Sequence, residues 1–262
     1  MADHRIYGRA RLARRPKPDV TKRKAYAMQQ SCNSAIAALQ PKNESNTTTL
    51  KARSRLILGD CINVLKTLPG HSIDLVVTDP PYLINYKARD GRSIMNDSNK
   101  DWVFPAFQEI TRVLKNDAFM VSFYGWNKAH HFLRVWQKLG LRPVGHFACI
   151  KSYASKRGFT EMSHENAYLL AKGNPSKPVS APRDVLAMPY SGNRLHPTQK
   201  PIELLSRFIR AYSKQGDTIL DPFAGSASTA VAAKSLGREC IAIEKDPQYF
   251  TIAKQRVLAR AA

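Results

Sequence analysis

The chain has 262 residues, of which 41 are Lys or Arg and 20 are Asp or Glu, so its formal net charge is +21 at pH 7. A hydrophobic content of 43% supports a real core and excludes disorder throughout. No apolar stretch is long enough to span a bilayer, and the Arg-rich start lacks the apolar region of a secretory signal, so we expect a cytoplasmic protein. The charge favours nucleic acid as partner, because Lys and Arg that neutralise phosphates release counterions. A charged surface without a partner is the alternative.

The first 54 residues are predicted to form a basic arm ahead of a folded domain at residues 55–262. The first 55 residues hold 13 Lys or Arg against three acidic residues and lack a sustained apolar face. The polar run at residues 43–49 is predicted to be the linker. The arm would lie on phosphates, or it would be a flexible terminus without a contact. The four cysteines form no CxxC pair, which predicts neither a zinc site nor a disulfide framework.

From Arg55 on, strand-like apolar runs alternate with helix-like segments, which predicts an α/β fold with a doubly wound, mainly parallel sheet and helices on both faces. The predicted strands are Arg55–Leu58, Ile73–Thr78, Ala118–Phe123, Val144–Lys151, Ala167–Ala171, Thr218–Asp221 and Glu239–Glu244. The predicted helices are Cys61–Leu68, Val103–Leu114, Trp126–Leu139, Ile202–Tyr212, Ser228–Leu236 and Pro247–Arg260. Two long irregular stretches remain, Leu83–Asp101 and Ser152–Leu195, and such loops are usually functional or disordered.

The sharpest motif is Asp79-Pro80-Pro81-Tyr82, which follows the strand Ile73–Thr78 at the sheet edge where open α/β sheets bind ligands. Two prolines fix the backbone and remove two amide donors. We therefore expect the Asp79 carboxylate and the Pro80 carbonyl to converge as acceptors, with no local donor to occupy them. Such a pair would accept both N–H groups of an exocyclic amine and localise its lone pair for attack on a methyl group. Tyr82 would stack on an extruded base; a plain Pro-Pro turn is the alternative.

A second motif, Asp221-Pro222-Phe223-Ala224-Gly225-Ser226-Ala227-Ser228, runs from a strand end through small residues into a helix. Small residues let the backbone approach a ligand closely, and a helix N-terminus favours a negative group such as a carboxylate. The strand Cys240–Ile243 ends at Glu244, an acidic side chain suited to hold both hydroxyls of a ribose. Together these features predict a nucleoside site, with a tight turn beside a solvated Glu as the alternative.

Two further segments are weak signals on their own. His196-Pro197-Thr198-Gln199-Lys200-Pro201 precedes an amphipathic helix and would present Thr198 and Lys200 to a carboxylate. Gly59-Asp60-Cys61 follows the strand at Arg55–Leu58, and Asp60 has a plain alternative reading as a helix N-cap.

Together the four segments resemble the amino-group DNA methyltransferases that use S-adenosylmethionine, in the permuted (beta) class whose catalytic tetrapeptide precedes the cofactor loop. The resemblance covers Arg55–Arg260, and the segments occur in that family's order. It implies a Rossmann-like methyltransferase fold for residues 55–262. It also implies transfer of a methyl group from S-adenosylmethionine to an amino group of a base in DNA.

The resemblance also implies the role of each motif residue. The tetrapeptide, Asp79, Pro80, Pro81 and Tyr82, binds and activates the target base. Asp60 contacts the adenine of the cofactor and Glu244 its ribose. The methionine part is contacted by Asp221, Phe223 and Gly225, and its carboxylate lies near Thr198 and Lys200. The implied cofactor-binding set is Asp60, Cys61, Asp79, Thr198, Lys200, Asp221, Phe223, Ala224, Gly225, Ser226 and Glu244.

Two departures from the family pattern affect these expectations. The usual final glycine of the cofactor turn is Ala227, which would weaken packing if φ there must be positive, although alanine suits a helical start. A large target-recognition insert is absent, so recognition is expected from a small region near residues 152–195 and from Leu83–Asp101, which would act as a lid. This predicts a short or relaxed recognition sequence. The predicted DNA-binding residues are Lys87, Arg89, Arg92, Lys151, Tyr153, Lys156 and Arg157; solvated loops are the alternative.

A tetrapeptide that begins with Asp and ends with Tyr resembles the adenine-N6 members more than the cytosine-N4 members, which often begin with Ser. We therefore predict an adenine-specific DNA methyltransferase that flips its base, as an orphan enzyme or as half of a restriction-modification pair. Cytosine-N4 methylation is the alternative. A DNA-binding regulator on an inactive scaffold and a protein-glutamine methyltransferase fit less well, because Asp79, Tyr82 and Glu244 are intact and the chain is basic. No metal is expected, and a second copy of the chain is a candidate partner because dimers are common in the family.

Overall fold

The structure is a computed structural model that describes residues 47–49, 54–86, 91, 94–95, 97–155 and 159–259. The sheet belongs to a compact unit that begins at Ser45. Of the arm predicted at residues 1–54, all but residues 47–49 and 54 lie outside the described residues.

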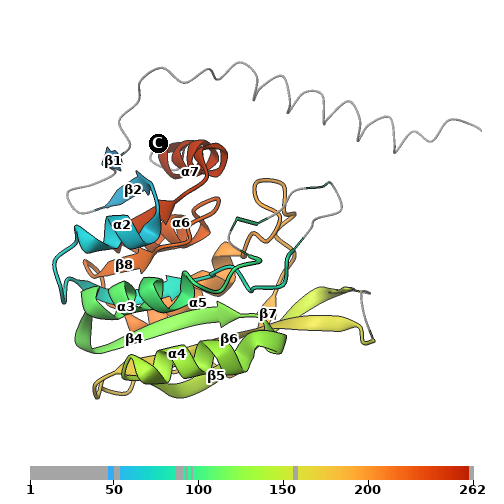
Figure 1. Cartoon of the computed structure of the whole chain (residues 1–262), viewed down its shortest axis with the longest axis horizontal. Coiled ribbons are helices and arrows are strands. Elements are labelled where there is room, and N and C mark those ends of the chain that lie inside the picture. The colour runs from blue at the N-terminus through green and yellow to red at the C-terminus, as the bar shows by residue number, and fades with distance from the viewer. Residues whose placement is uncertain are drawn as a thin grey trace, which may run out of the picture. The chain divides into compact units, whose positions relative to one another are not determined.

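The described residues form helices and strands that alternate along most of the chain (Figure 1). The strands are β1 (Thr47–Thr49), β2 (Arg55–Leu58), β3 (Ile73–Thr78), β4 (Leu114–Tyr124), β5 (Leu141–Ser155), β6 (Met162–Lys172), β7 (Val185–Met188), β8 (Thr218–Asp221) and β9 (Glu239–Glu244). The helices are α2 (Cys61–Lys66), α3 (Val103–Val113), η1 (Trp126–Lys128, a 3₁₀ turn), α4 (Ala129–Lys138), α5 (Ile202–Tyr212), α6 (Ser228–Ser235) and α7 (Pro247–Ala259).

The described strands form one mixed sheet in the order β1-β2-β9-β8-β3-β4-β6-β5-β7. Strands β2, β9, β8, β3 and β4 run parallel, and β7 runs parallel to β5. Strand β1 is antiparallel to β2, and β6 is antiparallel to both β4 and β5. The predicted doubly wound, mainly parallel sheet is confirmed, because five of these eight pairings are parallel.

Successive strand residues point to opposite faces of the sheet, so each central strand contributes to two separate cores. In β3, Val76 packs with α2, α3 and α4 on one face, whereas Val77 packs with α5, α6 and α7 on the other. Strands that are buried on both faces need continuous apolar runs, and the sequence Ile73–Thr78 supplies one.

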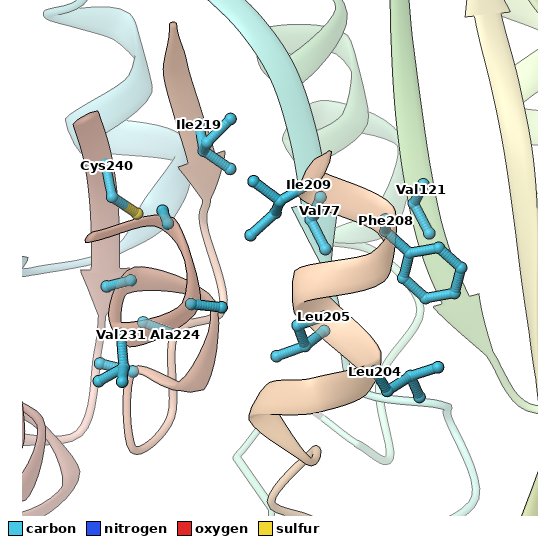
Figure 2. Close-up of a cluster of buried hydrophobic side chains, with 14 of the residues drawn as sticks. Val77, Val121, Leu204, Leu205, Phe208, Ile209, Ile219, Ala224, Val231 and Cys240 are labelled. Atoms are coloured by element: carbon cyan, nitrogen blue, oxygen red, sulfur yellow. The ribbon is translucent and has the colours of Figure 1, made fainter. Parts of the chain in front are cut away.

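Helix α5 shows how one apolar face fixes a helix on the sheet (Figure 2). Leu204, Leu205, Phe208 and Ile209 are at most 2% exposed and lie on one side of the helix. The ring of Phe208 packs 4.8 Å from the ring of Phe147. Truncating such a buried aromatic side chain costs about 3–5 kcal/mol, so this face holds the segment before α5 firmly at the site.

The structure differs from the predicted elements mainly where strands pair with distant partners. The linker predicted at residues 43–49 contains β1, because its threonines favour extended backbone and pair with Arg55–Ile57. Beyond the predicted strand Ala167–Ala171, the stretch predicted as irregular at Ser152–Leu195 contains β7 and the rest of β6, and β5 extends to Ser155. These strands have exposed positions and proline-rich flanks, so only their pairing in the sheet reveals them.

Candidate active site

A cavity opens at the carboxyl ends of β3, β8 and β9. These ends meet at one edge because the three strands are parallel neighbours in the sheet. The structure therefore brings together residues from distant parts of the chain. All predicted catalytic and cofactor-binding residues line this cavity: Asp60, Cys61, Asp79, Pro80, Pro81, Tyr82, Thr198, Lys200, Asp221, Phe223, Ala224, Gly225, Ser226 and Glu244.

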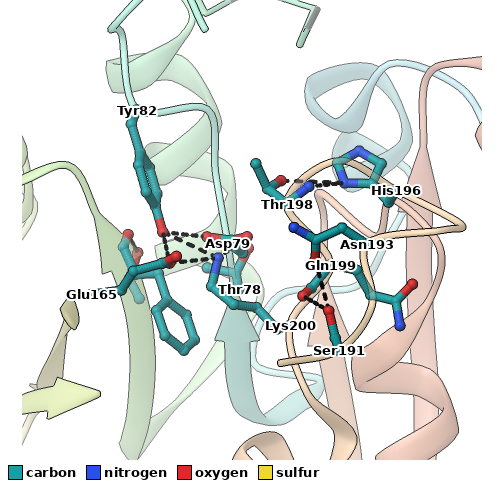
Figure 3. A network of polar contacts seen from close by, with 12 residues as sticks. Thr78, Asp79, Tyr82, Glu165, Ser191, Asn193, His196, Thr198, Gln199 and Lys200 are labelled. Carbon is teal, nitrogen blue, oxygen red and sulfur yellow. Dashed lines mark hydrogen bonds and ion pairs between the residues drawn. The ribbon is translucent and has the colours of Figure 1, made fainter. Parts of the chain in front are cut away.

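The Asp79 carboxylate lies at the centre of a partly buried polar network (Figure 3). Its Oδ1 accepts a hydrogen bond from the Tyr82 hydroxyl at 2.6 Å, and its Oδ2 pairs with Lys200 Nζ at 2.5 Å. Lys200 Nζ also lies 3.1 Å from Glu165 Oε2 and 3.3 Å from the Tyr82 hydroxyl. One ammonium group thus joins two carboxylates from different strands.

This network corrects one expectation for the catalytic turn. The Asp79 carboxylate was expected to have no local donor, but both of its oxygens already carry one, from Tyr82 and from Lys200. The contact with Lys200 could not be predicted from the local sequence, because Lys200 lies 121 residues further along the chain and reaches Asp79 only in the fold. Each Asp79 oxygen retains a second lone pair, so an incoming amino group adds to these donors or replaces them.

Burial sets the protonation of this network, and ion pairing opposes it. Burial raises the pKa of Asp79, while the Lys200 ammonium counteracts that rise. Burial disfavours the Lys200 ammonium, but Asp79 and Glu165 outweigh it and hold the pKa of Lys200 above its usual range. The pKa of Tyr82 is raised by burial and by Asp79, so its hydroxyl keeps its proton and donates. The network thus places one ammonium group between two carboxyl groups.

Glu165 is a site residue that the sequence reasoning missed. It lies in the middle of β6, opposite Cys149 of β5, and its side chain is 26% exposed. No motif surrounds it, and its contact with Lys200 depends on the antiparallel placement of β6 beside β4. Its neighbours Ser163, His164 and Asn166 are polar as well, so the local sequence does not single it out.

Lys200 is placed differently from its expected role. It was predicted beside a cofactor carboxylate, yet its ammonium contacts Asp79 and Glu165, and its side chain is 5% exposed. Thr198, the other residue of that prediction, bonds its own segment: its N and Oγ1 lie 3.3 and 3.2 Å from His196 Nδ1. Because the Lys200 ammonium is already paired, the predicted contact with the cofactor carboxylate depends on Thr198 more than on Lys200.

On the opposite wall, Glu244 is held by backbone amides. Its Oε2 accepts from Gly225 N and its Oε1 from Asp246 N, both at 2.7 Å. Burial raises the pKa of Glu244 to about 7, against the lowering effect of these two hydrogen bonds. The carboxylate is fixed beside the cofactor loop, with lone pairs left for hydroxyl donors such as those of a ribose.

Asp221, at the end of β8, is a buried carboxylate with a raised pKa. It is 3% exposed, and its Oδ1 accepts from Phe223 N at 3.2 Å and from Thr78 Oγ1 at 3.3 Å. Burial raises its pKa to about 6. A buried carboxylate whose hydrogen bonds come from neutral groups is stabilised by a cation, such as the amino group of an amino acid.

The cofactor turn needs left-handed backbone at two positions. Gly225 has a φ of 52°, and a Cβ there would lie 3.3 Å from His196 Cδ2. Ala227 has a φ of 60° and is completely buried as the residue that precedes α6. The φ of Ala227 is therefore positive, which is the case in which a cost was expected, and its left-handed backbone carries a strain of about 1–2 kcal/mol.

Asp60 combines the two readings that the sequence left open. Its Oδ1 accepts from Ile62 N at 3.0 Å as the N-cap of α2, and its Oδ2 lies 3.0 Å from Lys245 Nζ. It also lines the cavity, as does Cys61, whose thiol pKa is raised to about 12 by burial. A protonated Cys61 is an apolar wall rather than a nucleophile.

The segment after the tetrapeptide, expected as a lid, is held by a buried carboxylate in its described part. Asp97 is 2% exposed and accepts from Leu83 N at 2.7 Å and Tyr86 N at 2.6 Å. Leu83 and Asn85 have positive φ values, 62° and 52°, which this anchor supports. Ile84 and other apolar side chains of the segment line the cavity.

Two of the predicted DNA-binding residues lie among the described ones. Lys151 Nζ lies 5.2 Å from the ring centroid of Tyr153, which is 40% exposed. The Tyr153 ring contacts that of Tyr190 edge to face at 5.2 Å, because β7 runs parallel to β5. The other predicted DNA contacts lie outside the described residues: Lys87, Arg89, Arg92, Lys156 and Arg157.

No group of three or more His, Cys, Asp or Glu side chains among the described residues could hold a metal ion. None of the helices that the structure describes is both long and apolar enough to cross a membrane.

The fold and the cavity define an α/β enzyme that holds a nucleoside-bearing cofactor beside a buried, hydrogen-bonded carboxylate. Residues 73–255 match the model of the N6 and N4 methyltransferases, a family described as DNA methylase. The chain belongs to this family. Its cofactor is S-adenosylmethionine, and its substrate class is DNA.

Relatives and solved structures agree with this assignment. The chain is 47% identical over 206 residues to YubD of Escherichia coli K12, which is named as a methylase, covering 79% of this chain and 91% of YubD. It is 27% identical to the type II methyltransferase M.HinfI of Haemophilus influenzae, covering 77% and 67% of the two chains. The fold is similar to that of M1.HpyAVI with S-adenosylmethionine, with a TM-score of 0.61, 23% identity and coverage of 77% and 98%. It is also similar to the cytosine-N4-specific PvuII DNA methyltransferase, with a TM-score of 0.65, 21% identity and coverage of 79% and 86%.

The residues of the cavity fit this cofactor. Asp221 offers a buried carboxylate for the amino group of its methionine part, and Gly225 leaves no side chain between the turn and the cavity. Glu244 is positioned by two backbone amides beside that turn. The donor supplies an electrophilic methyl group on a sulfonium.

Proposed function

We propose that the protein methylates the N6 amino group of adenine in DNA, as a member of the permuted class. The observation that carries the proposal is the tetrapeptide with Asp79 in first place, which lines the same cavity as the cofactor turn. The order of the motifs supports the permuted class, since β3 and its tetrapeptide precede β8 and the cofactor turn along the chain.

In this proposal, Asp79 and Pro80 perform the activation. The Asp79 carboxylate accepts one N–H of the amino group, and the Pro80 carbonyl accepts the other. These bonds draw the nitrogen toward a tetrahedral shape, so its lone pair forms the new N–CH₃ bond while the S–CH₃ electron pair stays on sulfur. The nitrogen becomes strongly acidic as it gains the methyl group, and its proton passes to Asp79 or to water.

Tyr82 would hold the extruded base, and the structure shows how its ring is placed. The hydroxyl donates to Asp79, and the side chain passes close to Gly125, where an added Cβ would lie 3.0 Å from Tyr82 Cβ. Gly125 thus leaves room for the tyrosine at the end of β4. A ring in this position offers its face to a base whose amino group reaches Asp79.

For DNA binding we propose two contact regions. The first consists of Lys151, Tyr153 and Tyr190, where a cation and two aromatic rings lie together at the ends of β5 and β7. Aromatic rings stack on unpaired bases and lysines pair with phosphates.

The second proposed contact region is the basic arm, residues 1–54. We expect it to bind phosphates through its excess of Lys and Arg. Removing residues 1–44 keeps β1 in the sheet. The dependence of the logarithm of the DNA-binding constant on the logarithm of the salt concentration should become shallower, by about 0.9 in slope for each lost phosphate contact on duplex DNA. An unchanged slope would show that the arm does not touch the backbone.

Cytosine-N4 methylation is the second candidate, and a specific observation favours it. The PvuII enzyme, whose fold is similar to that of this chain, is cytosine-N4-specific. Both reactions use an exocyclic amine, so the same pair of acceptors at Asp79 and Pro80 would serve either base.

Mass spectrometry of nucleosides distinguishes the two candidates. Unmethylated DNA is incubated with the protein and S-adenosylmethionine, digested and compared with a reaction of the Asp79→Asn variant. We expect N6-methyldeoxyadenosine with the wild type alone. N4-methyldeoxycytidine in its place would assign the cytosine reaction, and no methylated base on single or double strands would reject both.

A further inference from the structure

Lys200 uses every donor of its ammonium group inside the network. The group has three N–H bonds, and three acceptors surround it: Asp79 Oδ2 at 2.5 Å, Glu165 Oε2 at 3.1 Å and the Tyr82 hydroxyl at 3.3 Å. The side chain is 5% exposed, and its Nζ lies 4.8 Å from the Phe123 ring centroid. A buried ammonium stays at this place only while it has an anion beside it.

The pairing with Lys200 works against the proposed role of Asp79. A carboxylate that shares a buried ion pair has less electron density to offer an amino group than an unpaired one. The incoming base therefore gains most if Lys200 moves off Asp79 Oδ2 at that moment. Lys200 can leave Asp79 only if another anion takes its charge.

Glu165 is that other anion. It is within ion-pair distance of Lys200 already, and it reaches the network from β6, on a different element from Asp79. Its Oε2 is also 3.5 Å from the Tyr82 hydroxyl, so both groups that now occupy Asp79 have Glu165 as their nearest alternative acceptor in Figure 3. The network offers Lys200 two carboxyl groups, so one of them remains as its partner when it leaves the other.

We propose that Glu165 is a positioning residue that accepts Lys200 from Asp79 when the base enters, and so frees the Asp79 carboxylate for the amino group. The inference rests on the proposed function. It requires only a side-chain rotation of Lys200 between two acceptors that it already contacts. Glu165 touches neither the base nor the methyl group, and it acts through Lys200.

The test uses the full chain, plasmid DNA grown in a host without adenine or cytosine methyltransferases, and tritium-labelled S-adenosylmethionine. Glu165→Gln keeps the shape of the side chain but removes the charge that draws Lys200. We expect the single-turnover rate of methyl transfer to fall at least tenfold. The Kd for S-adenosylmethionine and the KM for DNA should stay within about twofold of the wild-type values. A merely structural role would change these constants together with the rate of transfer.

The matched control is Glu203→Gln, the same chemical change at an exposed position in the first turn of α5. It should transfer at the wild-type rate. A Glu165→Gln variant as fast as the wild type would overturn the inference, and so would a loss that appears equally in cofactor affinity.

A second comparison tests whether Glu165 acts through Lys200 and remains available if Glu165→Gln does not fold. The double variant Glu165→Gln, Lys200→Met removes both charges together and is compared with Lys200→Met alone. We expect no further loss of rate from the glutamate change, whereas a further tenfold loss would overturn the inference. If the wild type itself transfers no methyl group, the proposed function fails; if only the variant results disagree, the inference alone fails.

Discussion

The two walls of the cavity hold their polar groups in different ways. On the cofactor side, which consists of Asp221, Gly225 and Glu244, carboxylates are fixed by backbone amides such as Gly225 N at 2.7 Å. On the base side, which consists of Asp79, Glu165 and Lys200, the carboxylates are joined by a single ammonium. Backbone contacts change only if the chain moves, whereas side-chain ion pairs exchange by rotation. The cofactor side is therefore preformed, and the base side can rearrange when a nucleotide enters.

The largest expected effect is on the base side. Asp79→Ala removes the acceptor that activates the amino group, so methyl transfer should fall by about 10²–10³-fold or more, the cost of deleting a group that stabilises a transition state. The Kd for S-adenosylmethionine should change by only a few fold. Transfer of label to DNA and calorimetry measure the two effects, with the exposed Asp184→Ala as control. Turnover by Asp79→Ala at the wild-type rate would contradict the proposal that the base side activates the amino group.

The next effect is on the cofactor side and depends on pH. The pKa of Asp221 is raised to about 6 by burial, and the role we propose for it requires an ionised carboxylate that pairs with the amino group of the donor. Protons compete with the cofactor below that value. The affinity for the cofactor should therefore decrease as the pH falls below about 6, and the decrease should approach tenfold per pH unit. The stability of the protein without cofactor depends on pH in the opposite direction. Because the raised pKa lets the folded state bind the proton more tightly than the unfolded state, the free energy of unfolding decreases as the pH rises through 6.

Titration calorimetry between pH 5 and 8 measures this dependence. In Asp221→Asn the affinity should be lower throughout, and the step near pH 6 should disappear. A step that persists in the variant would assign the proton to another group, of which Glu244, with a pKa of about 7, is the first to examine.

A smaller effect is expected outside the cavity, at the contact region of Lys151, Tyr153 and Tyr190. Tyr153→Ala removes a partly exposed ring, and we expect the Kd for DNA to rise about fivefold, near the lower end of what one stacked base contributes. Tyr153→Phe keeps the ring and should bind like the wild type. Fluorescence anisotropy with labelled DNA measures both, and equal binding by Tyr153→Ala would place the contact elsewhere.

The smallest effect concerns a position of the cofactor side that carries strain. Ala227→Gly relieves a left-handed backbone in a buried turn, so the free energy of unfolding should rise by about 1 kcal/mol and the Tm by roughly 2–4 °C. Ala230→Gly, in the interior of α6, is the matched control and should lower stability by about the same amount. Calorimetric scans of the two variants should therefore shift in opposite directions.

The sequence predicts the two walls unequally, for physical reasons. The strands Ile73–Thr78, Thr218–Asp221 and Glu239–Glu244 are short apolar runs that end at a motif, so local pattern is enough to find them, and the structure has the same bounds. Glu165 belongs to no motif, and it meets Lys200 only because β6 lies antiparallel beside β4. Pairing between distant segments of this kind leaves little trace in local composition.

The helices follow the same rule. Helix α5, with its apolar face on the sheet, has the predicted bounds Ile202–Tyr212, and the other predicted helices differ mainly at their ends. Residues 126–139, predicted as one helix, are divided between η1 and α4. The polar threonines of β1 predict a linker, whereas its place in the sheet depends on its pairing with β2.

Both borders of the sheet are very short strands. Strand β1 has three residues and β7 has four, beside the much longer β5. Unpaired backbone groups at a sheet border are a template for aggregation, and short border strands limit the length over which another chain can add. Shortening the chain beyond Thr49 would leave the backbone N–H and C=O groups of β2 that now pair with β1 without partners, so such a protein should self-associate more readily than one that begins at Ser45.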